Sequence, residues 1–183
     1  MSVRPIRLFG DPVLRRKAIP VTDFGRELAE LVTDLTDTML DANGGGIAAP
    51  QIGVGMRVFT YVVEGVVGHV VNPVVEPLGD EEQLTREGCL SIPRLPFDCT
   101  RHLSVVTTGV DLHGEPIRFE GTGRLSVIVE HETDHLDGIL FVDRLDPANR
   151  ELAEQAIREA EWSGGTVPEI RLSPHAPLLR SAV

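Results

Sequence analysis

The stretch VIVEHETDHLDG, Val127–Gly138, contains the pattern HExxH, in which His131 and His135 flank Glu132. If this stretch is helical, residues four apart lie on one face, so the two imidazoles can bind one metal ion. Glu132 beside them can move protons for a water that the metal activates. The alternative is a chance pair on an exposed helix, because six of the 183 residues are histidine. A buried helix is favoured by its apolar residues, which are Leu125, Ile128, Val129 and Leu136.

The ends of this helix also have sequence signals. Thr122 can cap the first turn through its hydroxyl group, and Gly138 can end the last turn in a left-handed conformation. The β-branched run Val127, Ile128 and Val129 is unfavourable in an isolated helix. We therefore expect tertiary packing to hold this helix in place.

Length and composition limit the classes of protein to consider. A chain of 183 residues with 42% hydrophobic residues suits one domain with its own core. A net charge of −11 argues against a nucleic-acid partner and against an anionic membrane surface. The sequence has no secretory signal and no apolar run near the roughly 20 residues of a membrane span. We predict a cytoplasmic protein.

Two cysteines, Cys89 and Cys99, could form one disulfide. In a chain without an export signal, free thiols or metal ligation are favoured over a disulfide.

Periodic patterns predict the other elements. Asp11-Pro12 resembles an N-cap followed by proline, which opens a short helix. A longer helix is expected over residues 24–42, with Asn43 and Gly44 at its end. Its apolar stripe consists of Leu28, Leu31, Val32, Leu35 and Met39.

Strands are predicted over 57–63 and 65–71, with the second strand broken at Asn72-Pro73. The polar stretch 78–86 is predicted as a loop, and 103–112 with 116–120 as a hairpin. A last helix is expected over 148–161 after the cap Asp146. The expected domain covers 1–162, and 163–183 is expected to be a loosely ordered tail.

Two histidines leave a metal short of one protein ligand. In metzincins a third histidine follows at a fixed distance, but Phe141 stands at that position. In thermolysin-like enzymes a later glutamate completes the site, and Glu151 and Glu154 are candidates by position only. The remaining strong ligand lies upstream, at Cys89.

Three stretches together resemble the peptide deformylase family. They are GGGIAAPQ at 44–51, EGCLS at 87–91 and HETDH at 131–135, in the order and approximate spacing of that family. The resemblance extends over about residues 4–146, through GDPVLR at 10–15 and LDGILFVD at 136–143. The departures are Glu130 in place of a common Gln, Ile47 in place of Leu, and a less polar stretch at 94–97.

The resemblance implies an α+β fold in which antiparallel strands surround a central buried helix that carries HExxH, with a C-terminal helix. It also implies a hydrolase that removes the N-formyl group from the formyl-methionine of nascent polypeptides and releases formate. An HExxH metallopeptidase and a metal-binding protein without turnover are the alternatives. The implied partners are N-formylmethionyl nascent peptides at the ribosome, with no specific nucleic acid and no membrane.

The resemblance also assigns the site residues. Cys89, His131 and His135 are expected to hold one divalent metal ion, with Glu132 as the proton-transfer group. Iron, as Fe(II), is the implied ion, although the donor set alone suits Zn(II), and Ni(II) or Co(II) are alternatives. The remaining assignments are the oxyanion donors Gln51 and Leu90 (through its backbone N–H) and the substrate main-chain partners Gly45 and Gly46.

Overall fold

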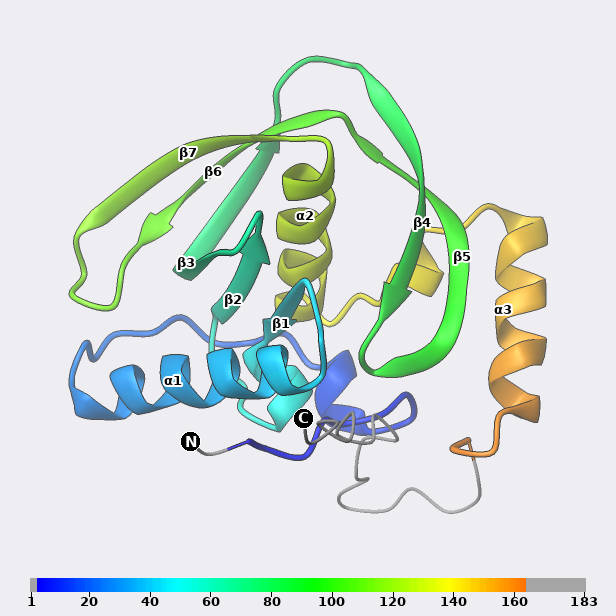
Figure 1. The fold of residues 1–183 in the computed structure, drawn as a ribbon, viewed down its shortest axis with the longest axis horizontal. Coiled ribbons are helices and arrows are strands. Elements are labelled where there is room, and N and C mark those ends of the chain that lie inside the picture. The colour runs from blue at the N-terminus through cyan, green and yellow to red at the C-terminus, as the bar shows by residue number, and fades with distance from the viewer. Residues whose placement is uncertain (1–2, 164–183) are drawn as a thin grey trace, which may run out of the picture.

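Residues 3–163 are described by a computed structural model, and they form two antiparallel sheets with three α-helices (Figure 1). The five-stranded sheet has the order β1 (Gly46–Ala48), β2 (Val58–Val63), β3 (Val66–Pro77), β6 (Ser104–Val110) and β7 (Pro116–Thr122). The two-stranded sheet pairs β4 (Glu82–Cys89) with β5 (Ile92–His102). The helices are α1 (Arg26–Asp41), α2 (Arg124–Leu136) and α3 (Pro147–Glu159). Short 3-10 turns cover η1 (Pro12–Arg15), η2 (Ala49–Ile52) and η3 (Phe141–Asp143).

Helix α2 lies between the two sheets and contacts strands of both (Figure 1). Val129 and Leu136 are fully buried against the larger sheet in a cluster with Phe59 and Val70. Burial of these side chains compensates for the weak helix propensity of the Val-Ile-Val run. The expected mixture of helices and antiparallel sheets is confirmed.

The predicted helices agree with the structure within one or two residues, which is the usual uncertainty of helix ends. The stripe Leu28, Leu31, Leu35 and Met39 of α1 packs into one core cluster. Asn43 follows the helix in a left-handed conformation, with φ of 53°, as its expected stop signal requires.

The prediction of a loop over 78–86 is wrong, because β4 begins at Glu82. Its exposed face carries Glu82, Leu84 and Arg86, so the alternation of apolar and polar residues that marks a half-buried strand is missing. Pairing with β5, which the sequence did not indicate, stabilises this polar strand.

The break predicted at Asn72-Pro73 is also wrong, because β3 continues to Pro77. The register with β6 shifts between Val71 and Val74, so Pro73 lies in a β-bulge. A residue in a bulge makes no ladder hydrogen bond, so the missing N–H of the proline is tolerated there. The Asn72 side chain accepts from Val21 N and donates to Val21 O at this point.

The expected Thr122 cap of α2 is wrong as well. Gly123 occupies the N-cap position without a side-chain hydrogen bond, and the Thr122 hydroxyl donates to Leu103 O instead. At the other end, Gly138 follows α2 with φ of 76°, as predicted for its stop signal.

The N-terminal segment ties three distant parts of the chain together. Arg7 N donates to Gln51 O (2.7 Å), Phe9 N to Ser91 O (2.8 Å) and Ala18 N to Leu136 O (2.8 Å). The three acceptors belong to the three stretches that carry the family resemblance or directly follow one of them. We call residues 7–18 the N-terminal strap.

Within residues 3–163, no helix is long and apolar enough to cross a membrane. Apart from Ser163, the predicted tail lies outside the described residues.

Candidate metal centre and active site

Cys89, His131 and His135 meet at one buried point. Cys89 is the last residue of β4, on the same face of the strand as Glu87 and toward α2, and the two histidines lie one turn apart on α2. One ligand atom from each lies within 4.8 Å of the others. Cys89 Sγ and His135 Nε2 are 3.2 Å apart. The HExxH helix and the strand that ends in Cys89 thus bring together the three predicted ligands.

The chemistry of these donors fits a divalent transition-metal ion. A thiol and two imidazoles converge, and no carboxylate separates them. Among residues 3–163, Glu132 Oε2 is a buried polar atom without a hydrogen-bond partner. A buried carboxylate oxygen without a protein partner, next to these donors, is expected where a reacting water and an ion belong.

Glu87 fixes the orientation of His131. His131 Nδ1 lies 2.6 Å from Glu87 Oε1, and because the carboxylate can only accept, Nδ1 carries the hydrogen and Nε2 keeps its lone pair for a metal. Arg101 donates two hydrogen bonds to Glu87, at 2.9 and 2.8 Å. The contact of Glu87 with His131 was not predicted.

Asp134 extends this network away from the metal centre. It accepts from Arg101 Nη1 (2.7 Å) and from Arg144 Nη2 (2.6 Å), and it is itself buried. Asp134 is therefore a buried residue whose carboxylate binds arginines. It holds the arginine that holds Glu87.

The charges in this network shift the titration of its members. Burial alone would raise the pKa of Glu87, but hydrogen bonds from Arg101 and His131 outweigh it and lower that pKa from 4.5 to about 2. Burial disfavours a charged His131, but the neighbouring Cys89 and Glu87 outweigh it and raise the pKa of His131. Burial, and then the charge of His131, lower the pKa of His135, which favours the neutral imidazole that ligates metals.

Glu132 occupies space that only a glycine leaves open. A Cβ placed on Gly46 would lie 2.5 Å from Glu132 Oε1, and real Cβ atoms do not approach this closely. Burial, more than any neighbouring charge, raises the pKa of Glu132 to about 7. A carboxyl group with a pKa near neutrality can both take up and release a proton.

Gln51 is held in one orientation by its own turn. Its Oε1 accepts from Ala48 N (2.8 Å), so Nε2 faces Ser91 Oγ (3.2 Å) and Cys89 Sγ (3.7 Å). The donor Ala48 N identifies which amide atom of Gln51 is oxygen. The Gln51 amide therefore presents N–H groups to the metal centre, and Ser91, which sequence reasoning did not single out, supports it.

Strand β1 leaves one main-chain edge open. It is an outer strand of the larger sheet, and Gly45 O accepts from Val62 N (2.8 Å). Antiparallel pairs alternate between hydrogen-bonded and non-hydrogen-bonded, so the next pair, Gly46 with Tyr61, is non-hydrogen-bonded. The N–H and C=O of Gly46 thus point away from β2, toward the cavity.

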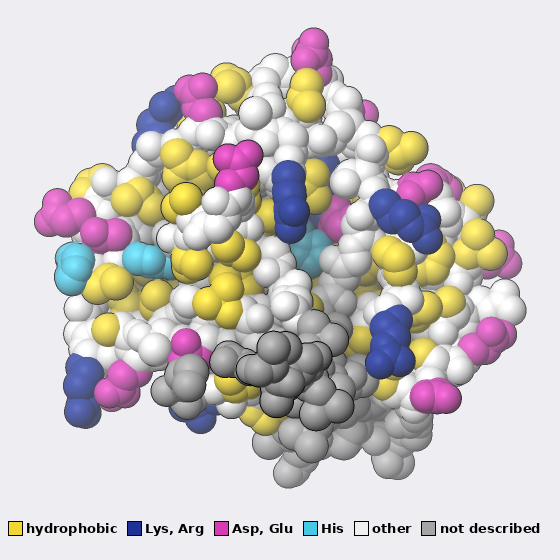
Figure 2. Space-filling model, viewed as in Figure 1, with side chains coloured by type: hydrophobic (Ala, Val, Ile, Leu, Met, Phe, Trp, Pro, Cys, Tyr) yellow, Lys and Arg dark blue, Asp and Glu magenta, His cyan; other side chains and the backbone are white. Residues whose placement is uncertain are grey.

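A cavity of about 670 Å³ opens onto this centre. Figure 2 shows a hollow in the middle of this face with a histidine visible inside it. The cavity is lined by Gly44, Gly45, Gly46, Gln51, Glu87, Cys89, Leu90, His131 and Glu132, together with apolar and basic residues. Its volume is within the range of about 300–1,000 Å³ that is usual for ligand-binding sites.

Cys99 lies outside the ligand cluster. It is buried and free, and burial raises the pKa of its thiol to about 12. Phe141, which replaces the third histidine of metzincins, stacks on the His131 ring with centroids 6.1 Å apart. Neither residue supplies a ligand atom to the cluster.

This fold and site define a class of hydrolases that carry HExxH on a helix and a buried cysteine beside it. The sequence model of the family described as "Polypeptide deformylase" matches residues 3–151. A peptide deformylase from Acidothermus cellulolyticus is 58% identical over 175 residues, which cover 96% of each chain. The chain belongs to the peptide deformylase family, whose members remove the N-formyl group from the N-terminal methionine of nascent peptides.

Solved structures agree with this assignment. The peptide deformylase from Thermus thermophilus has a TM-score of 0.81 and 42% identity, and the match covers 86% of this chain and 94% of that one. A Met-Ala-Ser-bound deformylase from Acinetobacter baumannii has a TM-score of 0.76 and 34% identity, with 79% and 100% covered.

Proposed function

We propose that this chain deformylates N-formylmethionyl peptides at the cavity described above, with Cys89, His131 and His135 as the metal ligands. The observation that supports this is the convergence of the three donors within 4.8 Å, beside a buried glutamate. When bound, a divalent ion supplies Lewis-acid chemistry that lowers the pKa of water and polarises a carbonyl group.

Fe(II) is the proposed resident ion. The donor set alone would favour Zn(II), because sites with nitrogen and sulfur ligands generally bind Zn(II) more tightly than Fe(II). The family resemblance favours Fe(II), with Ni(II) and Co(II) as active replacements. A thiolate ligand and Fe(II) can both be oxidised, so we expect activity that decays in air.

Glu132 is proposed to move the protons of the reaction. It takes a proton from the attacking water as the oxygen bonds to the formyl carbon. It then returns a proton to the amine nitrogen as the C–N bond breaks, which yields formate and a free N-terminus. Its raised pKa, about 7, suits both steps near neutral pH.

Gln51 and Leu90 are proposed to stabilise the oxyanion of the tetrahedral intermediate. Gln51 Nε2 is already oriented toward Cys89 by the bond from Ala48 to its oxygen. The backbone N–H of Leu90 follows Cys89 directly in the chain, and Leu90 lines the same cavity. Two donors held in place before the charge develops need little reorganisation.

The substrate main chain is proposed to add to the open edge of β1, where Gly46 offers its N–H and C=O. Gly45 was predicted as a second main-chain partner, but its C=O already accepts from Val62 N (2.8 Å) within the sheet, so this role is proposed for Gly46 alone. The methionine side chain is assigned to the apolar wall formed by Leu90, Val127 and Ile128. The Acinetobacter relative described as bound to Met-Ala-Ser supports a peptide of this kind at the site.

On the scale of the chain, we infer that α2 is the central buried element around which the strands are organised. We propose one deformylase domain over residues 1–162, with 163–183 as the tail that the sequence predicts. The substrates are nascent chains, so we place the enzyme in the cytoplasm beside the ribosome.

Formate release from formyl-Met-Ala-Ser tests this proposal. The apo-protein is loaded without oxygen with Fe(II), Ni(II) or Zn(II), and Met-Ala-Ser without the formyl group serves as the control for peptidase activity. We expect formate with Fe(II) and Ni(II), and no cleavage of the unformylated peptide. Equal or greater activity with Zn(II), indifferent to air, would overturn the iron assignment. Cleavage of internal peptide bonds would favour a metallopeptidase instead.

Replacing Glu132 with alanine separates catalysis from metal binding. Glu132 is not assigned as a ligand, so the variant is expected to keep a full complement of metal. General acid–base groups contribute about 10²–10⁴-fold to rate, so turnover should fall by at least that factor. A variant with metal and near-normal activity would contradict the role.

A further inference from the structure

The rim of the active-site cavity has a charge opposite to that of the whole chain. Arg86, Arg94 and Arg124 line the cavity, and all three are exposed. The acidic lining residues, Glu87 and Glu132, are both buried and belong to the catalytic centre. The chain has 28 acidic and 17 basic residues, so its surface is mostly acidic. A rim that carries arginines and no exposed carboxylate differs from the rest of that surface. Figure 2 shows basic side chains around the central hollow.

Two of these arginines have no counter-charge in residues 3–163. Arg86 lies 3.4 Å from Asp98, and this partner offsets its charge. Arg94 and Arg124, in contrast, form no ion pair or side-chain hydrogen bond with a described residue. Their positive charges are thus available to a ligand that enters the cavity.

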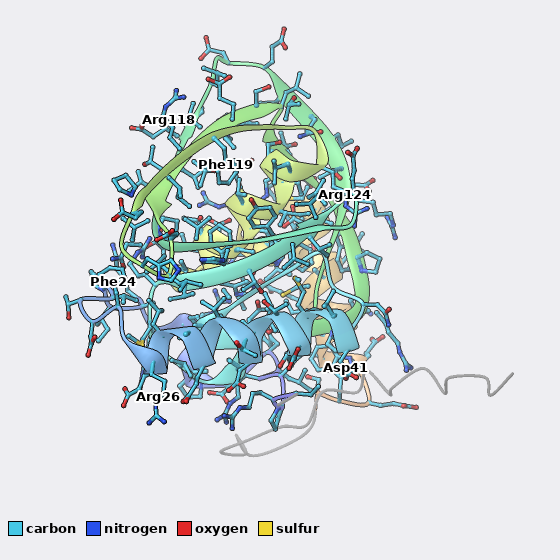
Figure 3. The ribbon with its side chains drawn as sticks, turned by 60° about the vertical axis from the view of Figure 1, so that its left-hand side comes forward. Phe24, Arg26, Asp41, Arg118, Phe119 and Arg124 are labelled. Atoms are coloured by element: carbon cyan, nitrogen blue, oxygen red, sulfur yellow. The ribbon has the colours of Figure 1, made fainter. Side chains whose placement is uncertain are left out.

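Arg124 lies beside the proposed path of the substrate main chain. Arg124 is the first residue of α2. Figure 3 labels its side chain, which lies on the side of the β4–β5 sheet. A Cβ on Gly45 would lie 3.6 Å from Arg124 Nη2, so the guanidinium group covers the glycine that precedes Gly46. A peptide paired with Gly46 would pass this group within a residue or two, because an extended chain rises about 3.3 Å per residue.

Arg94 is presented to the cavity by an unfavourable backbone conformation. Its φ is 63°, in the left-handed region that glycine and asparagine adopt more readily than arginine. A strained residue that carries a long cation at the rim of an active site indicates that the side chain contributes to function. Arg94 and Arg124 come from different elements, β5 and α2, and both line the one cavity.

We propose that Arg94 and Arg124 make this deformylase select formylated peptides that carry aspartate or glutamate in the two residues after methionine. The inference rests on deformylation at this cavity and adds a substrate class to it. Because the arginines are exposed, each acidic residue gains a modest, salt-sensitive attraction and not a buried ion pair. The preference therefore belongs in KM more than in kcat.

The test compares kcat/KM for formyl-Met-Asp-Asp-Ser-amide with that for formyl-Met-Asn-Asn-Ser-amide, using the metal-loaded enzyme. Asparagine matches the shape of aspartate, and the amidated end removes the terminal carboxylate. We expect the acidic peptide to be favoured roughly 4- to 25-fold at low salt, and this ratio to fall toward one at about 0.5 M NaCl. Peptides with one aspartate at either position then show which residue is read.

The variants Arg94→Gln and Arg124→Gln should each lower this ratio, and the double variant should bring it close to one. Arg118→Gln is the matched control, because Arg118 is an exposed arginine on β7 that does not line the cavity. The Arg118 variant should keep the wild-type ratio. Figure 3 labels both Arg118 and Arg124 on their separate elements.

Two results would overturn the inference while leaving deformylation intact. One is a wild-type ratio near one, with formate released from both peptides. The other is a ratio that survives in the double variant, which would place the selectivity elsewhere. Absence of formate release from any formylated peptide would refute the assigned reaction, and the inference with it.

Discussion

Gly46 leaves the space that Glu132, the proposed proton-transfer group, occupies. The Glu132 carboxylate occupies the space in which a Gly46 side chain would begin, at 2.5 Å from Glu132 Oε1. Gly46 does not have the positive φ that strains other residues, so the requirement for glycine at this position is steric. A single methyl group here should act on catalysis more than on the backbone.

We predict that Gly46→Ala lowers kcat/KM for formyl-Met-Ala-Ser by at least about 10²-fold, because displaced Glu132 no longer transfers protons well. Formate release measures the effect, and metal content shows whether the ligands are kept. Gly55→Ala is the control, since a Cβ there meets nothing within 4 Å and φ is not positive. Equal activity of the two variants would show that Glu132 tolerates displacement.

Gln51 tests the oxyanion assignment at the same scale. Its amide is oriented by the bond from Ala48 N to Oε1, so loss of the amide would remove the proposed oxyanion donor, which acts mainly in the transition state. Gln51→Leu should lower kcat about 10²–10³-fold with a modest change in KM. A change confined to KM would make Gln51 a substrate-binding residue.

The sheet of β4 and β5 shows how far element prediction from sequence could go. Apolar periodicity correctly located α1, α2 and α3, because each helix buries at least one face. Helix α2 buries a larger share of its surface than the other two. It failed for β4, whose polar residues form a strand only because β5 pairs with them. Pairing between segments is a tertiary property, and Asn72-Pro73 was likewise misread because a bulge accommodates the proline.

The candidate site was predictable to the extent that its residues carry their own chemistry. His131 and His135 are marked by helical spacing, and Cys89 by its strong ligand type and by the family resemblance. The contact between Glu87 and His131 was missed, because residues of β4 and α2 meet only once the sheets have folded around the helix. No local sequence pattern indicates the hydrogen bond between Ser91 and Gln51. The same is true of the hydrogen bonds that Asp134 accepts from Arg101 and Arg144.

Glu87 links strand β4 to helix α2, and this link should make the apo-protein sensitive to acid. The folded state lowers the pKa of Glu87 from 4.5 to about 2, so the unfolded chain binds this proton more readily. The stabilisation is complete above about pH 4.5 and is lost as the pH falls toward about 2. At pH 7 the buried pair with Arg101 is intact.

We predict that Glu87→Gln lowers the free energy of unfolding at pH 7 by about 3 kcal/mol, because buried Arg101 loses part of its counter-charge. The difference from the parent should shrink between pH 4.5 and 2, as the parent carboxylate becomes protonated. Urea unfolding of the two apo-proteins at several pH values measures this. Glu82→Gln, an exposed position on β4, is the control and should change little. A pH-independent difference would exclude the titration of Glu87 as the cause.

At the scale of the whole molecule, the predicted tail carries none of the assigned residues. All assigned residues lie before residue 140, and the family match ends at 151. We predict that removing Ser163–Val183 leaves kcat/KM for formyl-Met-Ala-Ser within about two-fold of the parent, well below the cost of losing a catalytic group. Circular dichroism of the truncated protein is the control for folding. A truncated protein that unfolds would show that the tail is part of the domain.

The N-terminal strap can complete its hydrogen bonds only late in synthesis of the chain. Arg7, Phe9 and Ala18 are made first, but their partners Gln51, Ser91 and Leu136 are spread over the rest of the domain. At a synthesis rate of about 5–20 residues per second, Ala18 waits roughly 6–24 s for the residue that accepts its N–H. Until then the three stretches cannot be fastened together, and a half-made chain has no complete active site. Each new copy must therefore depend on an older, finished one for any deformylation that its own early chain requires.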